Sequence, residues 1–106
     1  MNLRMDGRSF RFRISPEELG RLLVGRDLDE SVCIDIHRFG YRIIPAGDAP
    51  EMRLAMADGG FCLYVPGPML EELRGMGRSK EGLKIMQDGI ELALQVDIKT
   101  QARKVA

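Results

Sequence analysis

The sequence contains no tryptophan, only one histidine, His37, and only two cysteines, Cys33 and Cys62. One histidine and two cysteines without a CxxC spacing do not make any standard structural zinc set. Two cysteines are also too few for the disulfide framework of a small secreted protein. We therefore expect no metal site, and no motif in the chain indicates a cofactor.

An excess of charge of either sign is also missing. Sixteen basic residues balance sixteen acidic ones, which argues against a general nucleic-acid or membrane-surface binder but leaves room for a local basic face. No apolar run approaches the ~20 residues that a membrane-spanning helix needs, and the N-terminus lacks the apolar segment of a secretion signal. These absences favour a cytoplasmic protein that does not enter a membrane.

What the chain does contain is an ordinary globular mixture, with 44% hydrophobic and 30% charged residues over 106 positions. This length predicts a single domain covering residues 1–106.

An internal repeat organises that domain. Residues 1–44 align without a gap on residues 52–95, at an offset of 51 positions. Apolar residues recur with period two in four successive stretches of both copies, which is typical of half-buried strands. We interpret 1–44 and 52–98 as two repeats, joined by a proline- and glycine-containing linker at 45–51. The identical pairs include Met1/Met52, Leu3/Leu54, Phe10/Phe61, Leu19/Leu70, Leu22/Leu73 and Ile34/Ile85.

Each repeat is predicted to form two strands, a helix and two more strands. Ser15-Pro16-Glu17-Glu18 is a capping box, in which Ser15 begins the first helix and Glu18 reaches back to it. Pro66 to Pro68 open the second helix, and Asp-Gly pairs predict tight turns at 6–7, 58–59 and 88–89. The predicted strands are 2–6, 9–14, 31–36 and 39–44 in the first repeat, and 53–57, 61–65, 82–87 and 90–98 in the second.

This pattern predicts an α+β fold of two tandem ββαββ units with pseudo-twofold symmetry. The strands should form a mainly antiparallel sheet or a half-open barrel with two short helices. Alternation places Phe10, Phe39, Phe61, Ile34 and Ile85 on the core side. Because the inward positions are apolar, the sequence disfavours an interior lined with charged catalytic groups.

Candidate catalytic residues are few. His37 falls at or beside the turn between the third and fourth strands, two positions from Asp35, and no motif fixes a nucleophile next to it. Cys33 and Cys62 alternate with apolar neighbours and should point away from the core. The run from Gly77 to Gly82 has glycines and a cation, but it lacks the order of a phosphate loop. We therefore name no catalytic, cofactor or metal residue.

The basic residues give one further candidate. Arg4, Arg11, Arg13 and Arg42 fall on the polar face of the strands of the first repeat, where they could bind phosphate or carboxylate groups. Sheet-based nucleic-acid binders add aromatic residues to that face, and here the aromatic residues of the same strands have the opposite parity.

The ends of the chain resemble an uncharacterised family of short bacterial proteins. The resemblance is carried by Leu3-Arg4, Gly7, Ser9, Arg11, Arg13, Ile14-Ser15 and Glu18. That family begins with a Lys-Ile-Arg strand, a Gly-x-Ser turn, an Arg-x-Arg strand and a Leu-Thr-x-x-Glu helix start. The closing strand, Leu92 to Lys99, is similar too, although Ile98 interrupts the acidic–basic pair expected there. The resemblance implies an architecture and no activity.

Three functions remain open on the sequence alone. The first is a non-enzymatic interaction module that binds a protein partner or itself through open sheet edges. The second is an anion or nucleic-acid binder that uses the four arginines. The third is a small enzyme with Asp35, His37 or Cys62 in a cleft between the repeats.

Overall fold

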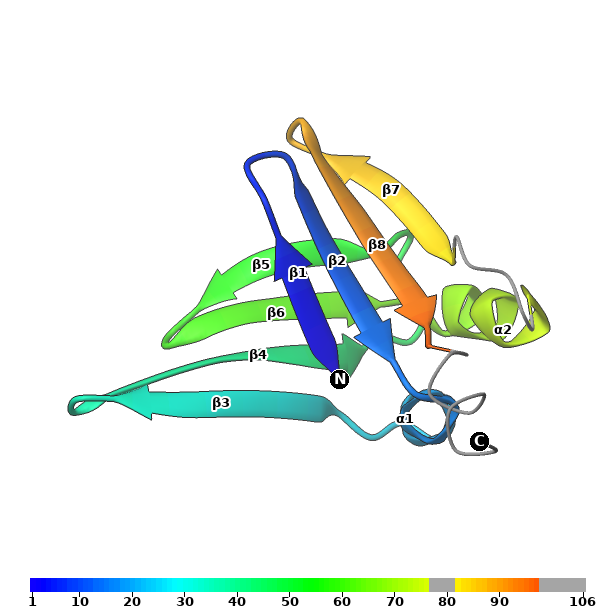
Figure 1. The fold of residues 1–106 in the computed structure, drawn as a ribbon. Helices are drawn as coiled ribbons and strands as arrows, with labels where there is room; N and C mark the ends of the chain where they lie inside the picture. Colours follow the sequence, from blue (N-terminus) through cyan, green and yellow to red (C-terminus); the bar gives the residue numbers. More distant parts are fainter. Residues whose placement is uncertain (77–81, 98–106) are drawn as a thin grey trace, which may run out of the picture.

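The computed structural model describes residues 1–76 and 82–97 and contains two successive ββαββ units (Figure 1). The α+β class and the order of elements are as predicted. The elements are β1 (Asn2–Met5), β2 (Ser9–Ile14), α1 (Pro16–Leu23), β3 (Leu28–Ile34), β4 (His37–Pro45), β5 (Arg53–Ala57), β6 (Gly60–Val65), α2 (Gly67–Met76), β7 (Leu83–Gln87) and β8 (Ile90–Val96).

The strands form two four-stranded sheets, and each sheet takes one hairpin from each unit. Sheet A has the order β1-β2-β8-β7, and sheet B has the order β3-β4-β6-β5. The hairpins are antiparallel, and the central pairs, β2 with β8 and β4 with β6, are parallel. Each sheet is therefore mixed, and the strands make two open sheets rather than one closed barrel.

The register of the central pairs follows the pseudo-twofold symmetry. Ser9 lies opposite Glu91 in sheet A, and Gly60 lies opposite Gly40 in sheet B. Positions 9 and 60, like positions 40 and 91, are 51 apart, so exchanging the two units maps one central pair onto the other. The offset found in the sequence thus relates equivalent backbone positions in these strands.

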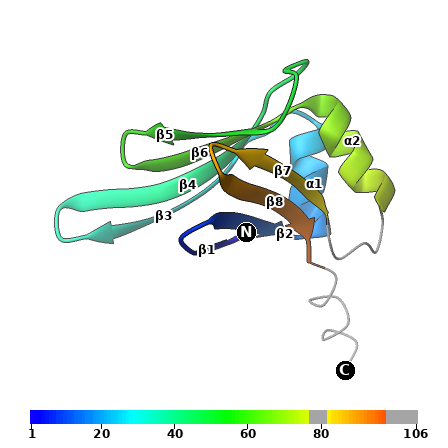
Figure 2. The ribbon, with the colours of Figure 1, turned by 90° about the horizontal axis from the view of Figure 1, so that it is seen from above.

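The two sheets pack against each other, and both helices lie together at one end of them, away from the hairpin turns (Figures 1 and 2). The core fills the space near the helices, because apolar side chains of both sheets and both helices meet there. Its fully buried members include Phe12, Ile14, Leu22, Ile43, Leu63, Leu70 and Leu94.

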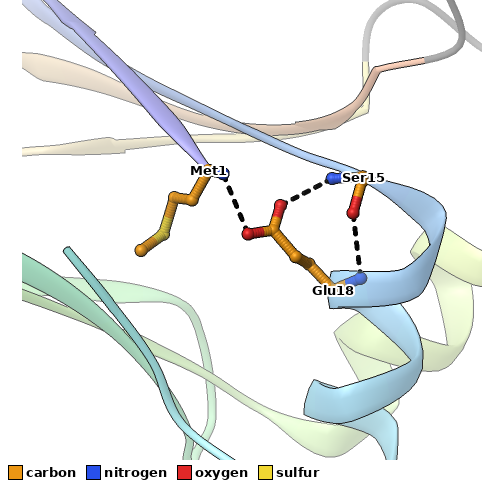
Figure 3. Close-up of polar contacts among 3 residues, drawn as sticks. All are labelled: Met1, Ser15 and Glu18. Carbon is orange, nitrogen blue, oxygen red and sulfur yellow. Dashed lines mark hydrogen bonds and ion pairs between the residues drawn. The ribbon is translucent and has the colours of Figure 1, made fainter. Parts of the chain in front are cut away.

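The capping box predicted for α1 is present (Figure 3). The backbone N–H of Glu18 donates to Ser15 Oγ at 3.1 Å, and the N–H of Ser15 donates to Glu18 Oε1 at 2.8 Å. The other carboxylate oxygen accepts from the Met1 amino group at 2.8 Å. Partial burial alone raises the pKa of Glu18, but the Met1 and Ser15 hydrogen bonds and the Met1 charge outweigh it, so the pKa lies below its ordinary value.

Two side chains join the sheets at equivalent places. Gln87 on β7 of sheet A donates to the carbonyl of Leu54 on β5 of sheet B and accepts from the N–H of Leu54, each at 2.8 Å. Tyr41 on β4 makes a hydrogen bond with the backbone of Leu3 on β1. Since positions 3 and 54 are 51 apart, both contacts hold equivalent edge strands to the facing sheet. Burial, helped by the Glu30 charge, raises the pKa of Tyr41, and the Leu3 contact opposes this rise.

The third and fourth strands depart from the sequence prediction. The hairpin turn lies at Asp35-Ile36 and not at residues 37–38, so β3 and β4 begin earlier than expected. The β3–β4 hairpin contains seven residue pairs and β7–β8 contains five. The extra length lies at the turn. Leu28 pairs with Ile43 and Leu83 pairs with Leu94, and positions 43 and 94 are equivalent in the two units. The structural counterpart of Leu83 is therefore Leu28, and not Val32 as the offset of 51 would give.

This extra length also corrects the predicted core. Ile34, Val32 and Phe39 have the expected inward parity, but they are 64%, 56% and 44% exposed. They lie on the part of the hairpin that extends past the packed region near the helices. Cys62 points away from the main core cluster, as expected, but it is only 5% exposed. Phe10, Phe61 and Ile85 are half-buried.

Candidate functional site

The β3–β4 hairpin carries the densest group of exposed apolar side chains in the described part of the chain. It projects beyond sheet A on the side away from the helices (Figure 2). Such a group is unusual on the surface of a monomer, where large apolar patches mark interaction sites. We call Val32, Ile34, Ile36 and Phe39 the hairpin tip; Ile36, in the turn, is 92% exposed.

Aromatic contacts connect the hairpin tip to both sheets. Phe39 packs edge to face against Phe61 on the neighbouring strand β6, with ring centroids 5.8 Å apart. Phe61 in turn packs against Phe10 of sheet A at 5.2 Å. This chain of three rings fixes Phe39 to the body of the protein, so the hairpin tip is a supported surface and not a loose loop.

β3 also forms one edge of sheet B, because its only neighbour in the sheet is β4. Asp29 and Glu30 stand at its beginning, and the stretch Ser31 to Ile34 carries no charge. An uncharged stretch of edge strand beside an exposed apolar face lacks the protection that usually prevents pairing with another strand.

The residues weighed for catalysis do not meet. Asp35 and His37 are exposed at the end of the hairpin, whereas Cys62 pairs with Arg42, about 16 Å further along β4. His37 has the parity of Phe39 and faces inward, whereas Arg42 and Cys62 have the opposite parity. His37 and Cys62 therefore belong to opposite faces of sheet B and do not form a catalytic pair.

Cavities lie beside both sheets in the described part of the chain, and two of them are relevant to a candidate site. The larger, about 570 Å³, lies where the linker and β5 face β7, and Tyr64 and Gln87 line it. The side-chain amide of Gln87 is occupied by its two bonds to Leu54, whereas Glu51, Arg53 and Asp88 give the wall charges of both signs. The smaller, about 250 Å³, lies over sheet B and includes Cys62 and Arg42. Asp35 and His37 line neither cavity.

The structure brings together three of the four arginines considered for anion binding. Arg4 on β1 lies opposite Arg11 on β2, and Arg13 lies two positions further along β2 on the same outer face of sheet A. Arg42 lies on sheet B and binds Asp27 at 2.9 Å, so it belongs to a different surface. No group of three or more metal-ligating side chains occurs in residues 1–76 and 82–97. The Gly77–Gly82 run falls largely outside those residues.

The sequence missed the hairpin tip as a surface, because periodicity treats any alternating apolar strand as half-buried. One signal was present. Asp35 takes a positive φ of 56°, as Asp88 does at 53° in the second unit's turn, so an aspartate marks both turns. Aligning these two aspartates would have shown that the first hairpin is longer.

The fold and this surface define a two-sheet α+β protein with an open, apolar hairpin end. Within the described residues, no helix is long and apolar enough to cross a membrane. The chain belongs to a family of unknown function, DUF7009, whose model matches residues 1–100. This agrees with the resemblance to an uncharacterised family. No curated protein and no solved structure matches the chain.

Proposed function

We propose that this chain is a non-enzymatic interaction module that associates with a second copy of itself through the edge strand β3. The observation that carries the proposal is the extra length of the β3–β4 hairpin, which leaves the hairpin tip exposed. The proposal places the protein in the cytoplasm, where thiols such as the exposed Cys33 stay reduced.

Pairing along β3 would satisfy the unpaired backbone groups of the edge and cover apolar surface in the same step. Burial of apolar surface stabilises a complex by roughly 25 cal/mol per Å². Backbone hydrogen bonds along a strand edge fix the orientation of the added strand. Both contributions are available at one place, since Val32 and Ile34 of β3 belong to the hairpin tip.

The sequence of β3 favours a second copy as the occupant. β3 runs from Leu28 to Ile34, so an antiparallel pairing centred on Ser31 uses the whole strand of both copies. This register places Ile34 opposite Leu28 of the second copy, and within β3 it places no two like charges opposite each other. A pairing centred on Val32 would instead set Leu28 and Asp29 against the turn residues Ile36 and Asp35 of the second copy, so that only residues 30–34 of each strand would pair. The strand is thus self-complementary about Ser31, as a twofold interface requires.

Sedimentation of the full chain tests the proposal. The wild type is expected to form a dimer whose fraction rises with concentration. Ile34→Glu places a charge in the pairing surface and should give a monomer. Met86→Glu is a matched control, because Met86 and Ile34 are each 64% exposed and both changes add one negative charge. A monomeric wild type at every concentration, or equal effects of the two variants, contradicts the proposal.

Cysteine substitution tests the register. Ser31→Cys in a Cys33→Ser background should form an intermolecular disulfide on mild oxidation, because each copy of residue 31 lies opposite the other. In the wild type, the two copies of Cys33 would lie about 13 Å apart along the pair, too far for a disulfide. A direct Cys33–Cys33 disulfide would show that the copies pair in another register.

A further inference from the structure

The register of sheet A aligns three basic side chains in one row across its four strands. Arg4 on β1 lies opposite Arg11 on β2, Arg11 lies opposite Ala93 on β8, and Ala93 lies opposite Lys84 on β7. These side chains are on the outer face, because their neighbours along the strands, such as Phe12 and Leu94, enter the core. We call Arg4, Arg11, Ala93 and Lys84 the cationic row.

The arginines of this row are not neutralised by neighbours. Among residues 1–76 and 82–97, Arg4, Arg11 and Arg13 take part in no ion pair. Arg4 and Arg11 are direct cross-strand partners, and like charges in that position destabilise a sheet. In addition, Nε of Arg11 is buried and has no hydrogen-bond partner. Lys84 has an interaction of its own, so the inference depends on the three arginines.

Nearby carboxylates only partly offset these charges. Asp6, in the β1–β2 turn, has a lowered pKa, mainly because the Arg8 N–H donates to it, and the charge of Arg11 contributes least. Glu91 lies two positions from Ala93 on the same face of β8. Two acidic groups at one side of the row leave the pair Arg4 and Arg11, with Arg13 beside it, as a basic surface.

The pseudo-twofold symmetry supplies an internal comparison. The equivalent row of sheet B reads Ala55, Cys62, Arg42 and Asp29. It contains one cation and one carboxylate, and its arginine is already bound to Asp27. Because both rows have the same backbone arrangement, the fold does not require a row of cations in this place. The row of sheet B therefore lacks the two adjacent arginines without an ion pair, Arg4 and Arg11, that the row of sheet A presents, and this pair suits an anionic ligand.

We infer that Arg4, Arg11 and Arg13 bind successive phosphate groups of a linear polyanion. Arg4 and Arg11 lie ~4.8 Å apart across the strands, and Arg13 lies ~6.6 Å along β2 from Arg11, so the three arginines are spaced to contact neighbouring phosphates of one chain. Arginine suits this ligand, because its guanidinium group binds phosphate oxygens in pairs. The described residues of this face include no aromatic side chain for base stacking, so recognition is through phosphate and is independent of base.

Fluorescence anisotropy at low salt tests the inference, with a labelled oligothymidylate of about 12 nucleotides as one probe and labelled inorganic polyphosphate as the other. The two arms distinguish a nucleic-acid backbone from free polyphosphate, and binding of either supports the inference. The variant Arg4→Gln/Arg11→Gln should weaken binding by about tenfold and lower the slope of log affinity against log salt by about 1.4.

The matched control is Arg42→Gln/Arg53→Gln, which removes two arginines from the outer face of sheet B and changes the net charge equally. It should alter affinity less than about twofold. Arg11→Lys keeps the charge and the fold, and it should retain most of the salt dependence. The inference is overturned if the wild type binds neither probe, or if the sheet A and sheet B variants weaken binding equally. Neither result bears on dimer formation through β3, which is a separate surface.

Discussion

Gly60 shows how one residue position controls the joining of the two units. It begins β6, faces Gly40 across the parallel β4–β6 pair and has φ of +151°. A Cβ atom at this position would lie 1.6 Å from the carbonyl oxygen of Gly40, which is backbone and cannot rotate away. The close approach of the two strands therefore requires glycine here.

We expect Gly60→Ala to destabilise the protein by more than about 3 kcal/mol, because the clash and the disallowed backbone act together. Gly20→Ala is the control: Gly20 lies within α1, and a Cβ there meets nothing within 4 Å. This change should stabilise by about 0.5–1 kcal/mol. Urea unfolding of both variants measures the difference. Similar effects of the two substitutions would contradict the close approach.

Glu18 gives the stability of the fold a defined dependence on pH. Its pKa is lowered in the folded protein, so its contribution is fully present above the unfolded value near 4.3 and is lost as pH falls through the folded value. We expect Glu18→Gln to cost about 1 kcal/mol at pH 7, since glutamine keeps the capping contact but loses the charge facing Met1.

The difference in free energy of unfolding between wild type and Glu18→Gln should shrink towards zero below about pH 4. Glu17→Gln is the control, because Glu17 lies in the same first turn and is exposed. Its effect should be a few tenths of a kcal/mol. Chemical denaturation at several pH values makes the comparison, and a Glu18→Gln effect that is constant across pH would contradict the ion pair.

At the scale of elements, local chemistry predicts structure best where the deciding contacts are short in sequence. The capping box at Ser15, the strand 9–14 and the Asp88-Gly89 turn are in place because hydrogen bonds and backbone preferences within a few residues decide them. The third strand was misplaced for a different reason. Alternation identifies which side chains share a face of β3, but it does not say how far along the strand a covering layer extends.

The same distinction applies to the candidate surfaces. Parity correctly put Arg4, Arg11 and Arg13 on one outer face, but it could not show that Arg42 belongs to the other sheet. Pairing between distant strands depends on the whole fold, and the sequence period carries no information about it. The hairpin tip was missed because Ile34 and Phe39 have core parity, although no other layer of the fold covers them and both are exposed.

At the scale of the whole molecule, the exchange of hairpins between the units determines how the chain unfolds. Sheet A needs β7 and β8 from the second unit, and sheet B needs β3 and β4 from the first. A single unit would lack the strands that complete either sheet, and its part of the core would be exposed. We therefore propose that residues 1–106 behave as a single domain, although the sequence repeats.

We expect unfolding in one cooperative step, and the chain offers a reporter for each half. It has two tyrosines, Tyr41 in the first unit and Tyr64 in the second. Tyr64→Phe leaves the first as a fluorescent reporter, and Tyr41→Phe leaves the second. In each variant, the urea midpoint from tyrosine fluorescence should coincide with the midpoint from circular dichroism, because breaking either unit removes strands from both sheets. Tyr41→Phe also deletes the contact with Leu3, so its shared midpoint should be lower. A fluorescence midpoint that precedes the loss of secondary structure in either variant would mean that one half unfolds while the other persists.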